Sequence, residues 1–213
     1  MSAPAPTSAP ARRPVDAASL IVLDGEGEER SVLMGRRSAR HAFMPSVYVF
    51  PGGRVDRGDG APAPALPLPP HDVRRLVRGM GARGSERRAR ALAAAALRET
   101  EEEVGLRPRA DAGAPLRYVA RAITPPGRAR RFDARFFACR REALRPAPAD
   151  PTDELEDVRW VPLRATAELD LARITAVILH ELRERLALDP DLSRDLDVPH
   201  HRMRHRAFVR LLD

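Results

Sequence analysis

The sequence predicts an α/β fold in which helices cover a central mixed β-sheet. Three observations support this class. Short apolar runs typical of strands lie on both sides of a long helical segment, a second helical segment lies near the end, and no internal repeat is present. The 213 residues are 43% hydrophobic, which is sufficient for one domain with a sizeable core.

The N-terminal part reads as a tail followed by short strands. Residues 1–14 are rich in proline and alanine, so we expect them to be disordered. Three strands are expected next: residues 18–23 (ASLIVL), 31–34 (SVLM) and 47–50 (VYVF). The first two are separated by a turn signal and should form a hairpin. The third runs directly into Pro51-Gly52-Gly53, where backbone amides could approach a phosphate closely.

An insertion is expected at residues 60–84, which begin as a proline- and alanine-rich linker. Asp72 could cap a short helix that reaches Met80. This helix could act as a lid over a site or as a packed surface decoration, and the pattern favours neither. Ser85 then suits the N-cap of the long helix that ends before Gly105.

The second half of the chain adds strands and one more helix. Strands are expected at residues 116–123, 132–139 and 156–161, and a helix at residues 167–188. Residues 191–213 read as a basic C-terminal tail. His200, His201 and His205 have a spacing that could bind zinc, but no cysteine or acidic ligand lies near them, so a basic tail is the better interpretation.

Three carboxylates gather on one face at the end of the long helix. At about 100° per residue, Glu102 and Glu103 lie within about 60° of Glu99, whereas Glu101 points away. Crowded like charges repel unless a cation lies among them. Oxygen ligands on a rigid helix suit Mg²⁺ or Mn²⁺. The alternative is a solvated acidic helix end.

Charge and cysteine content narrow the function classes. The formal charge is +7 with a pI near 11.0, but all 37 basic residues are arginine and none is lysine. We attribute this excess to codon bias and expect no nucleic-acid partner. With no long apolar run or secretory signal, we expect no membrane partner and a cytoplasmic location. Cys139 is a single cysteine, expected to be a buried hydrophobe.

The glycine loop and the acidic helix together resemble the Nudix hydrolase signature, G-x5-E-x7-R-E-U-x-E-E-x-G-U, where U is aliphatic. The second half of that signature matches Arg98, Glu99, Glu102, Glu103, Gly105 and Leu106. Thr100 replaces an aliphatic residue, and Asp59, six positions after Gly53, replaces the glutamate. Residues 60–97, 38 in all, separate Asp59 from Arg98 where the signature has seven. The two halves would therefore have to meet in space.

This resemblance implies a Nudix-type α/β/α sandwich over residues 15–190 and metal-dependent hydrolysis of a nucleoside diphosphate linked to a second group. A split signature resembles the members that cleave coenzyme A and its thioesters. Arg37-Ser38, followed after eleven residues by Phe50-Pro51-Gly52-Gly53, is similar to their coenzyme A signature, although Ala42 and Ser46 replace its arginine and glycine. Coenzyme A or acyl-CoA would give 3′,5′-ADP and (acyl-)4′-phosphopantetheine.

The resemblance also assigns roles to residues. Glu99, Glu102 and Glu103 would hold Mg²⁺ or Mn²⁺ together with the backbone of Gly53, and Arg98 would tie the helix to the loop through Asp59 or Asp56. Glu154 is the candidate base or extra ligand. The expected substrate-binding residues are Arg37, Arg40, Phe43, Gly52, Gly53 and Arg131.

Other functions remain open at this point. The substrate could be ADP-ribose, NADH or a dinucleoside polyphosphate, or the chain could be a non-catalytic Nudix-like ligand sensor. RNA binding through arginine ranks last because no RNA-reading motif occurs. The partner is expected to be a small-molecule diphosphate, and the protein a monomer or homodimer.

Overall fold

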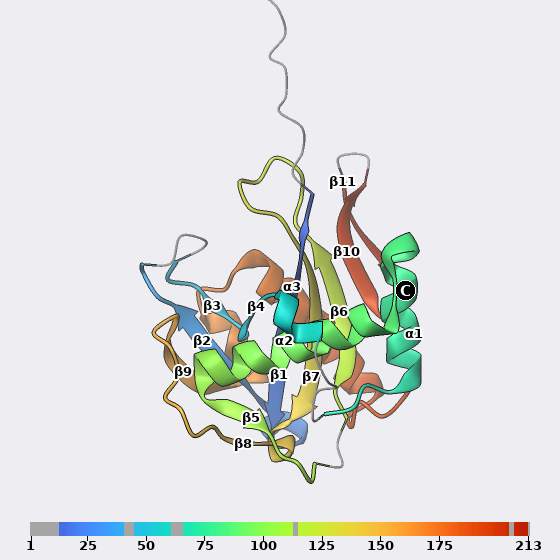
Figure 1. The fold of residues 1–213 in the computed structure, drawn as a ribbon. Helices are drawn as coiled ribbons and strands as arrows, with labels where there is room; N and C mark the ends of the chain where they lie inside the picture. Colours follow the sequence, from blue (N-terminus) through green and yellow to red (C-terminus); the bar gives the residue numbers. More distant parts are fainter. Residues whose placement is uncertain (1–12, 41–44, 61–65, 113–114, 205–206, 213) are drawn as a thin grey trace, which may run out of the picture.

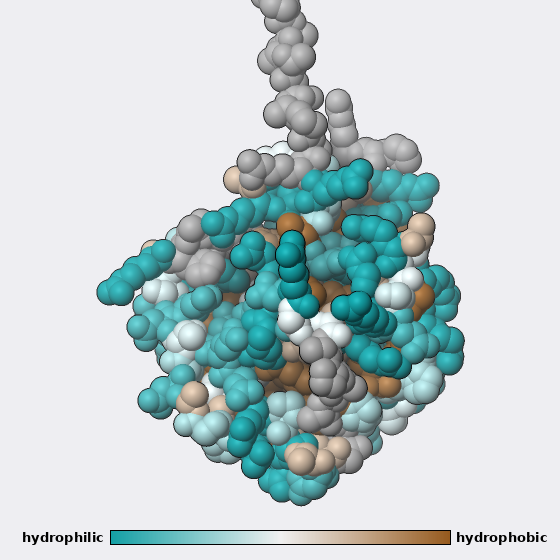
Figure 2. Space-filling view, in the orientation of Figure 1, coloured by the Kyte–Doolittle hydropathy of each residue, from teal (hydrophilic) through white to brown (hydrophobic). Residues whose placement is uncertain are grey.

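The computed structural model describes residues 13–40, 45–60, 66–112, 115–204 and 207–212. It has a three-layer α/β/α arrangement, with a large mixed sheet between helices (Figure 1). The predicted fold class is therefore confirmed. The face shown in Figure 2 is mostly hydrophilic, with apolar residues visible near its centre. Among the described residues, no helix is both long and apolar enough to cross a membrane.

The chain forms three α-helices and eleven strands within its described parts. The helices are α1 (Pro70–Gly79), α2 (Glu86–Val104) and α3 (Arg173–Leu188). The strands are β1 (Val15–Asp24), β2 (Ser31–Arg37), β3 (Tyr48–Val49), β4 (Gly52–Arg54), β5 (Leu106–Pro108), β6 (Arg117–Ile123), β7 (Phe132–Arg140), β8 (Leu144–Pro146), β9 (Leu155–Pro162), β10 (Pro199–Arg204) and β11 (Ala207–Leu212). Five short 3₁₀ turns lie at Gly27–Glu29, Arg57–Gly60, Gly81–Arg83, Arg141–Ala143 and Leu163–Glu168.

Strand β1 lies at the centre of the sheet. It pairs in parallel with β7 and antiparallel with both β2 and β4. The main path of the sheet runs β11-β10-β6-β7-β1-β2-β3, and β9 pairs with β2. The pairing of β1 with β4 places Gly53 opposite Ala18, which brings the glycine loop into the sheet. Strands β5 and β8 form a separate small sheet that was not expected from the sequence.

Alternation along β1 divides the core in two. Leu20 and Val22 belong to the core that contains the α2 residues, whereas Ile21 and Leu23 belong to the core that contains the α3 residues. All four side chains are fully buried. The run ASLIVL is apolar throughout because helices cover this strand on both faces.

Helix α2 begins and ends where the sequence predicted. The Ser85 side chain accepts a hydrogen bond from the Arg88 backbone N–H at 3.2 Å, as an N-cap does. Gly105 ends the helix in the left-handed conformation, at φ 67°. Along its length α2 buries a stripe of small side chains against the sheet, including Ala89, Ala93 and Ala96. Small residues let the helix approach the strands closely, which fixes the position of its acidic end.

Helix α1 in the insertion is anchored at both ends to β6. Asp72, 1% exposed, accepts hydrogen bonds from the Tyr118 backbone N–H at 3.0 Å and from Arg117 Nε at 3.3 Å. At the other end Arg121 donates to the Gly79 carbonyl at 2.7 Å. These buried contacts favour a packed decoration over a lid. Asp72 is not the N-cap that we expected, because the helix begins at Pro70 and its cap position is Pro69.

Helix α3 starts later than the sequence suggested. Residues 163–168 form a 3₁₀ turn, and the α-helix begins at Arg173 instead of residue 167. The intervening backbone pairs with β3: Tyr48 N–H donates to the Asp170 carbonyl at 2.8 Å, and Leu171 forms a bridge with Tyr48. Tertiary pairing therefore overrides local helix preference here.

The reading of residues 191–213 as a basic tail is wrong. Strand β10 pairs in parallel with β6, and β11 pairs antiparallel with β10. His201 is 5% exposed, and its Nε2 lies 2.9 Å from Glu181 Oε1 on α3. His201 hid the strand pattern because its polar partner, Glu181, lies on another element inside the fold. His205, the third histidine of the possible zinc spacing, lies outside the described residues.

Candidate active site

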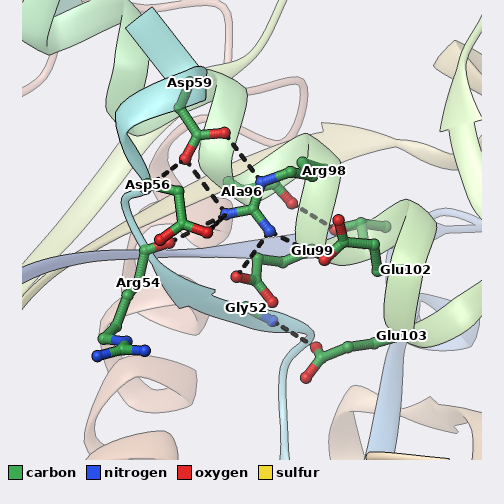
Figure 3. Close-up of polar contacts among 10 residues, drawn as sticks. Gly52, Arg54, Asp56, Asp59, Ala96, Arg98, Glu99, Glu102 and Glu103 are labelled. Carbon is green, nitrogen blue, oxygen red and sulfur yellow. Dashed lines mark hydrogen bonds and ion pairs between the residues drawn. The ribbon is translucent and has the colours of Figure 1, made fainter. Parts of the chain in front are cut away.

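The acidic end of α2 lies against the glycine loop, so the two halves of the split signature meet (Figure 3). A side chain at Gly53 would displace the Glu99 carboxylate, because an added Cβ would lie 2.3 Å from Glu99 Oε1. Gly52 is more strictly required, since its Cβ would lie 2.5 Å from the Ala18 carbonyl oxygen, which is a backbone atom. The two glycines therefore allow the helix and the central strand to approach the loop from opposite sides.

Arg98 ties the helix to the loop, as predicted. Its Nε and Nη2 donate to the two carboxylate oxygens of Asp59 at 2.9 and 3.2 Å, and Nη2 also donates to the Arg54 carbonyl at 3.0 Å. Asp56 is more distant, at 4.0 Å. Asp59 is 8% exposed and also accepts the Asp56 backbone N–H at 2.7 Å. The 3₁₀ turn at Arg57–Gly60 brings this shorter carboxylate within reach of Arg98.

The same guanidinium links two of the three predicted metal ligands. Arg98 Nη1 donates to Glu99 Oε1 at 3.0 Å and to Glu102 Oε2 at 2.9 Å. Figure 3 shows both carboxylates turned toward this arginine. The hydrogen bond to Asp59 is the main cause that raises the pKa of Arg98, so this cation stays charged at the site.

Glu103 is the most buried of the three carboxylates, at 5% exposure. One of its oxygens accepts the Gly52 backbone N–H at 2.7 Å. Burial raises the pKa of Glu103 to about 8, with the negative charges of Glu99 and Glu154 adding to the rise. The pKa of Glu99 is also raised, again mainly by burial. Burial therefore disfavours the charged forms of Glu99 and Glu103 in the absence of a bound cation.

Arg37 and Glu154 complete this charged cluster. Burial lowers the pKa of Arg37, while attraction to Glu103, Glu154 and Glu99 opposes that effect. The Glu154 carbonyl accepts the Ser38 backbone N–H at 3.0 Å, which holds the start of β9 beside the end of β2. The sequence predicted both residues for the site. The period of β2 could also have placed Arg37, because it shares a strand face with Leu33, which packs in the α2 core.

Two other observations concern the signature. Thr100, which replaces an aliphatic residue, is fully buried and donates from its hydroxyl to the Ala96 carbonyl at 2.7 Å. This bond satisfies the polar atom within the helix. Asp59 stands where the signature has glutamate, and its two hydrogen bonds with Arg98 confirm the predicted link between the helix and the loop.

Three predicted substrate-binding residues are not among these contacts. Arg40 is exposed, and its backbone N–H donates to Ser38 Oγ at 3.5 Å. Arg131 donates from Nε to the Thr124 carbonyl at 3.1 Å, which closes the base of the loop between β6 and β7. Phe43 lies outside the described residues. The structure thus joins Arg37, Gly52 and Gly53 to the acidic residues but gives no such support for Arg40 or Arg131.

The donor chemistry fits a hard divalent cation. Glu99, Glu102 and Glu103 supply only oxygen ligands from one helix, and the adjoining glycine loop can add a backbone carbonyl. Among the described residues, no group of three acidic, histidine or cysteine side chains already converges on a metal position. Glu99 and Glu102 would have to turn from Arg98 toward the cation.

Comparisons with known proteins agree with this geometry. A scan of protein families matched residues 84–182 to the NUDIX domain. No curated protein matched the chain. Among solved structures, a NUDIX hydrolase from Alicyclobacillus acidocaldarius is 27% identical, with a TM-score of 0.57 over 79% of this chain and 90% of that one.

Two more distant structures share the fold alone. The NUDIX domain of Shewanella oneidensis NrtR, solved in complex with ADP ribose, is 16% identical, with a TM-score of 0.52 over 82% of this chain and 90% of that one. A protein from Listeria monocytogenes, described as a NUDIX hydrolase, is also 16% identical, with a TM-score of 0.52 over 83% of this chain and 97% of that one.

Proposed function

We propose that this chain, of which residues 84–182 match the NUDIX domain, hydrolyses a nucleoside diphosphate linked to a second group with the help of Mg²⁺ or Mn²⁺. The observation that carries the proposal is the crowding of Glu99, Glu102 and Glu103 beside the Gly52–Gly53 loop, with the pKa of Glu103 raised to about 8. Like charges gathered at one helix end, two of them partly or fully buried, favour a cation among them.

Each residue has a role in this proposal. Glu99, Glu102 and Glu103 hold the cation, and Arg98 keeps the helix fixed on Asp59. A bound divalent cation would neutralise the diphosphate and lower the pKa of an attacking water. Arg37 lies close enough to Glu103 and Glu99 to interact with them electrostatically, so we assign it to the diphosphate itself. Glu154 is the candidate base, since its negative charge contributes to the raised pKa of both Glu99 and Glu103.

For the substrate we propose coenzyme A or an acyl-CoA. Support comes from Arg37-Ser38 and the Phe50-Pro51-Gly52-Gly53 run, whose spacing resembles a coenzyme A signature. Water would attack one phosphorus atom of the diphosphate, and the bond from that phosphorus to the bridging oxygen would break. The products would be 3′,5′-ADP and (acyl-)4′-phosphopantetheine, with the proton from water released to solvent or to the base.

A panel of diphosphates tests this proposal. The protein is incubated with Mn²⁺ and coenzyme A, acetyl-CoA, ADP-ribose, NADH or diadenosine polyphosphate, and the products are separated by anion-exchange chromatography. The proposal expects 3′,5′-ADP from the first two substrates. Turnover of ADP-ribose, NADH or the dinucleotide in the absence of coenzyme A turnover would reject the substrate and keep the reaction class.

The non-catalytic sensor is the alternative, and the hydrogen bonds of Arg98 with Glu99 and Glu102 are the observation in its favour. A site already neutralised by an internal cation can bind a ligand without a metal. Tight binding of one of these diphosphates in EDTA, with no product formed in Mn²⁺, would support the sensor.

A further inference from the structure

Among the described strands, β9 and β11 are the two longest at the edges of the large sheet, and their exposed sides differ. Within the described residues, β9 pairs only with β2 and β11 pairs only with β10. An outer strand carries unpaired backbone N–H and C=O groups on one side, which can accept a strand from another chain. Proteins that avoid such pairing protect their outer strands with charges, proline or bulges.

Strand β9 is protected in this way. Its register shifts opposite β2, so that Asp157 and Val158 lie between the paired positions Glu156 and Arg159. Asp157 adopts a left-handed conformation, at φ 47°, which bends the strand. Three of these four side chains are charged. A regular ladder with a second strand is therefore disfavoured at this edge.

Strand β11 has none of these features. All six residues from Ala207 to Leu212 pair with β10 in an unbroken register. The strand contains no proline, and Arg210 is its only charged residue. Phe208 and Leu212 are 43% and 56% exposed, which makes them two of the most exposed large apolar residues described. Figure 1 shows β11 beyond β10 at one side of the sheet.

The single charge on β11 is offset within the same chain. Arg210 donates from Nε and Nη2 to the two oxygens of Glu181 on α3, at 2.6 and 2.8 Å. This pairing leaves the strand without a net charge that would repel a like strand. Phe208 is also held in place, because its ring stacks on His201 with 5.8 Å between ring centres.

We propose that β11 pairs antiparallel with β11 of a second copy of this chain. The strand can pair with a copy of itself, because Phe208 and Leu212 lie on one face, each two residues away from Arg210. A two-fold axis through Arg210 then sets Phe208 of one copy opposite Leu212 of the other, twice in each dimer. The two Arg210 side chains meet at the axis with their charges already paired to Glu181.

The size of the contact sets the expected affinity. Six residues in a strand span about 20 Å, and an interface of this length is smaller than those of tight dimers. We therefore expect a dimer that dissociates on dilution, with the sheets of the two copies joined into one.

Sedimentation velocity over about 1 to 200 µM tests the proposal, since weak interfaces dissociate in this range. The wild-type chain should shift from monomer to dimer as the concentration rises. Leu212→Lys adds a charge at the contact and should weaken the dimer by about tenfold or more. Val158→Lys is the matched control, because Val158 is an exposed apolar strand residue on the opposite edge, at 39% exposure, and it should dimerise like the wild type.

Hydrogen exchange of the unmutated chain gives a second reading that does not depend on the fold of a variant. Amides of residues 207–212 should exchange more slowly at high than at low protein concentration, whereas those of β9 should not change. A monomer at every concentration, a Leu212→Lys variant that dimerises like the wild type, or unchanged exchange in β11 would overturn the proposal.

Discussion

Glu103→Gln should stabilise the metal-free protein at high pH, which is an unusual outcome for a change in an active site. The carboxyl of Glu103 is buried, and its pKa rises from 4.5 to about 8 on folding. Well below pH 4.5 the carboxyl is protonated in both the folded and the unfolded chain, so its ionisation does not change the free energy of unfolding. Between pH 4.5 and 8 the unfolded chain ionises first, and the wild-type fold loses stability as pH rises.

The pKa change sets the size of this effect. A rise from 4.5 to about 8 corresponds to about 5 kcal/mol of unfolding free energy above pH 8. Glutamine cannot ionise, and its carbonyl oxygen can still accept the Gly52 backbone N–H. The variant should therefore match the wild type near pH 4.5 and exceed it by several kcal/mol at pH 8.5.

Urea unfolding in EDTA, followed through the fluorescence of the partly buried Trp160, measures this difference at both pH values. Glu101→Gln is the matched control, because that side chain points away from the site on the same helix, and it should show no such pH dependence. A Glu103→Gln variant less stable than the wild type at pH 8.5, or an equal difference at both pH values, would refute the reasoning.

Two further predictions concern the contacts around the helix end. Arg98→Ala leaves the buried carboxylate of Asp59 without its two hydrogen bonds of 2.9 and 3.2 Å, so the free energy of unfolding from urea titrations should fall by about 2 kcal/mol; an unchanged value would mean that Arg98 does not anchor the loop. Gly53→Ala places a methyl group 2.3 Å from Glu99 Oε1 and should lower kcat for diphosphate hydrolysis by about tenfold or more. Gly58→Ala, which meets no atom within 4 Å, is its control, and equal activity of the two variants would contradict the assigned role of the glycine loop.

The sequence predicted the elements whose signals are local. The caps of α2 at Ser85 and Gly105 and the buried strand β1 all follow from residue type and spacing, and the structure confirms them. The acidic stripe on α2 follows from the helical period in the same way. The contact of Arg98 with Asp59 was also predicted, because a guanidinium and a carboxylate from the two halves of one signature can form a hydrogen-bonded ion pair.

Elements defined by distant partners could not be read from the sequence. His201 looked like part of a basic tail because its partner, Glu181, is on another element. The delayed start of α3 depends on the pairing of Asp170 with β3. Asp72 resembled a helix cap but is buried against β6, where Tyr118 and Arg117 satisfy it. In each case a long-range contact overrode the local preference.

The central claim is that the carboxylates of α2 hold a metal for diphosphate hydrolysis. Product release in Mn²⁺ from the substrate that the panel selects tests it most directly, with the wild type compared with Glu102→Gln. Glu102 is exposed at the helix end, so this variant should fold normally, which circular dichroism checks, while hydrolysis falls by about a hundredfold or more. Hydrolysis at the wild-type rate by a folded Glu102→Gln variant, or in excess EDTA, would contradict the claim.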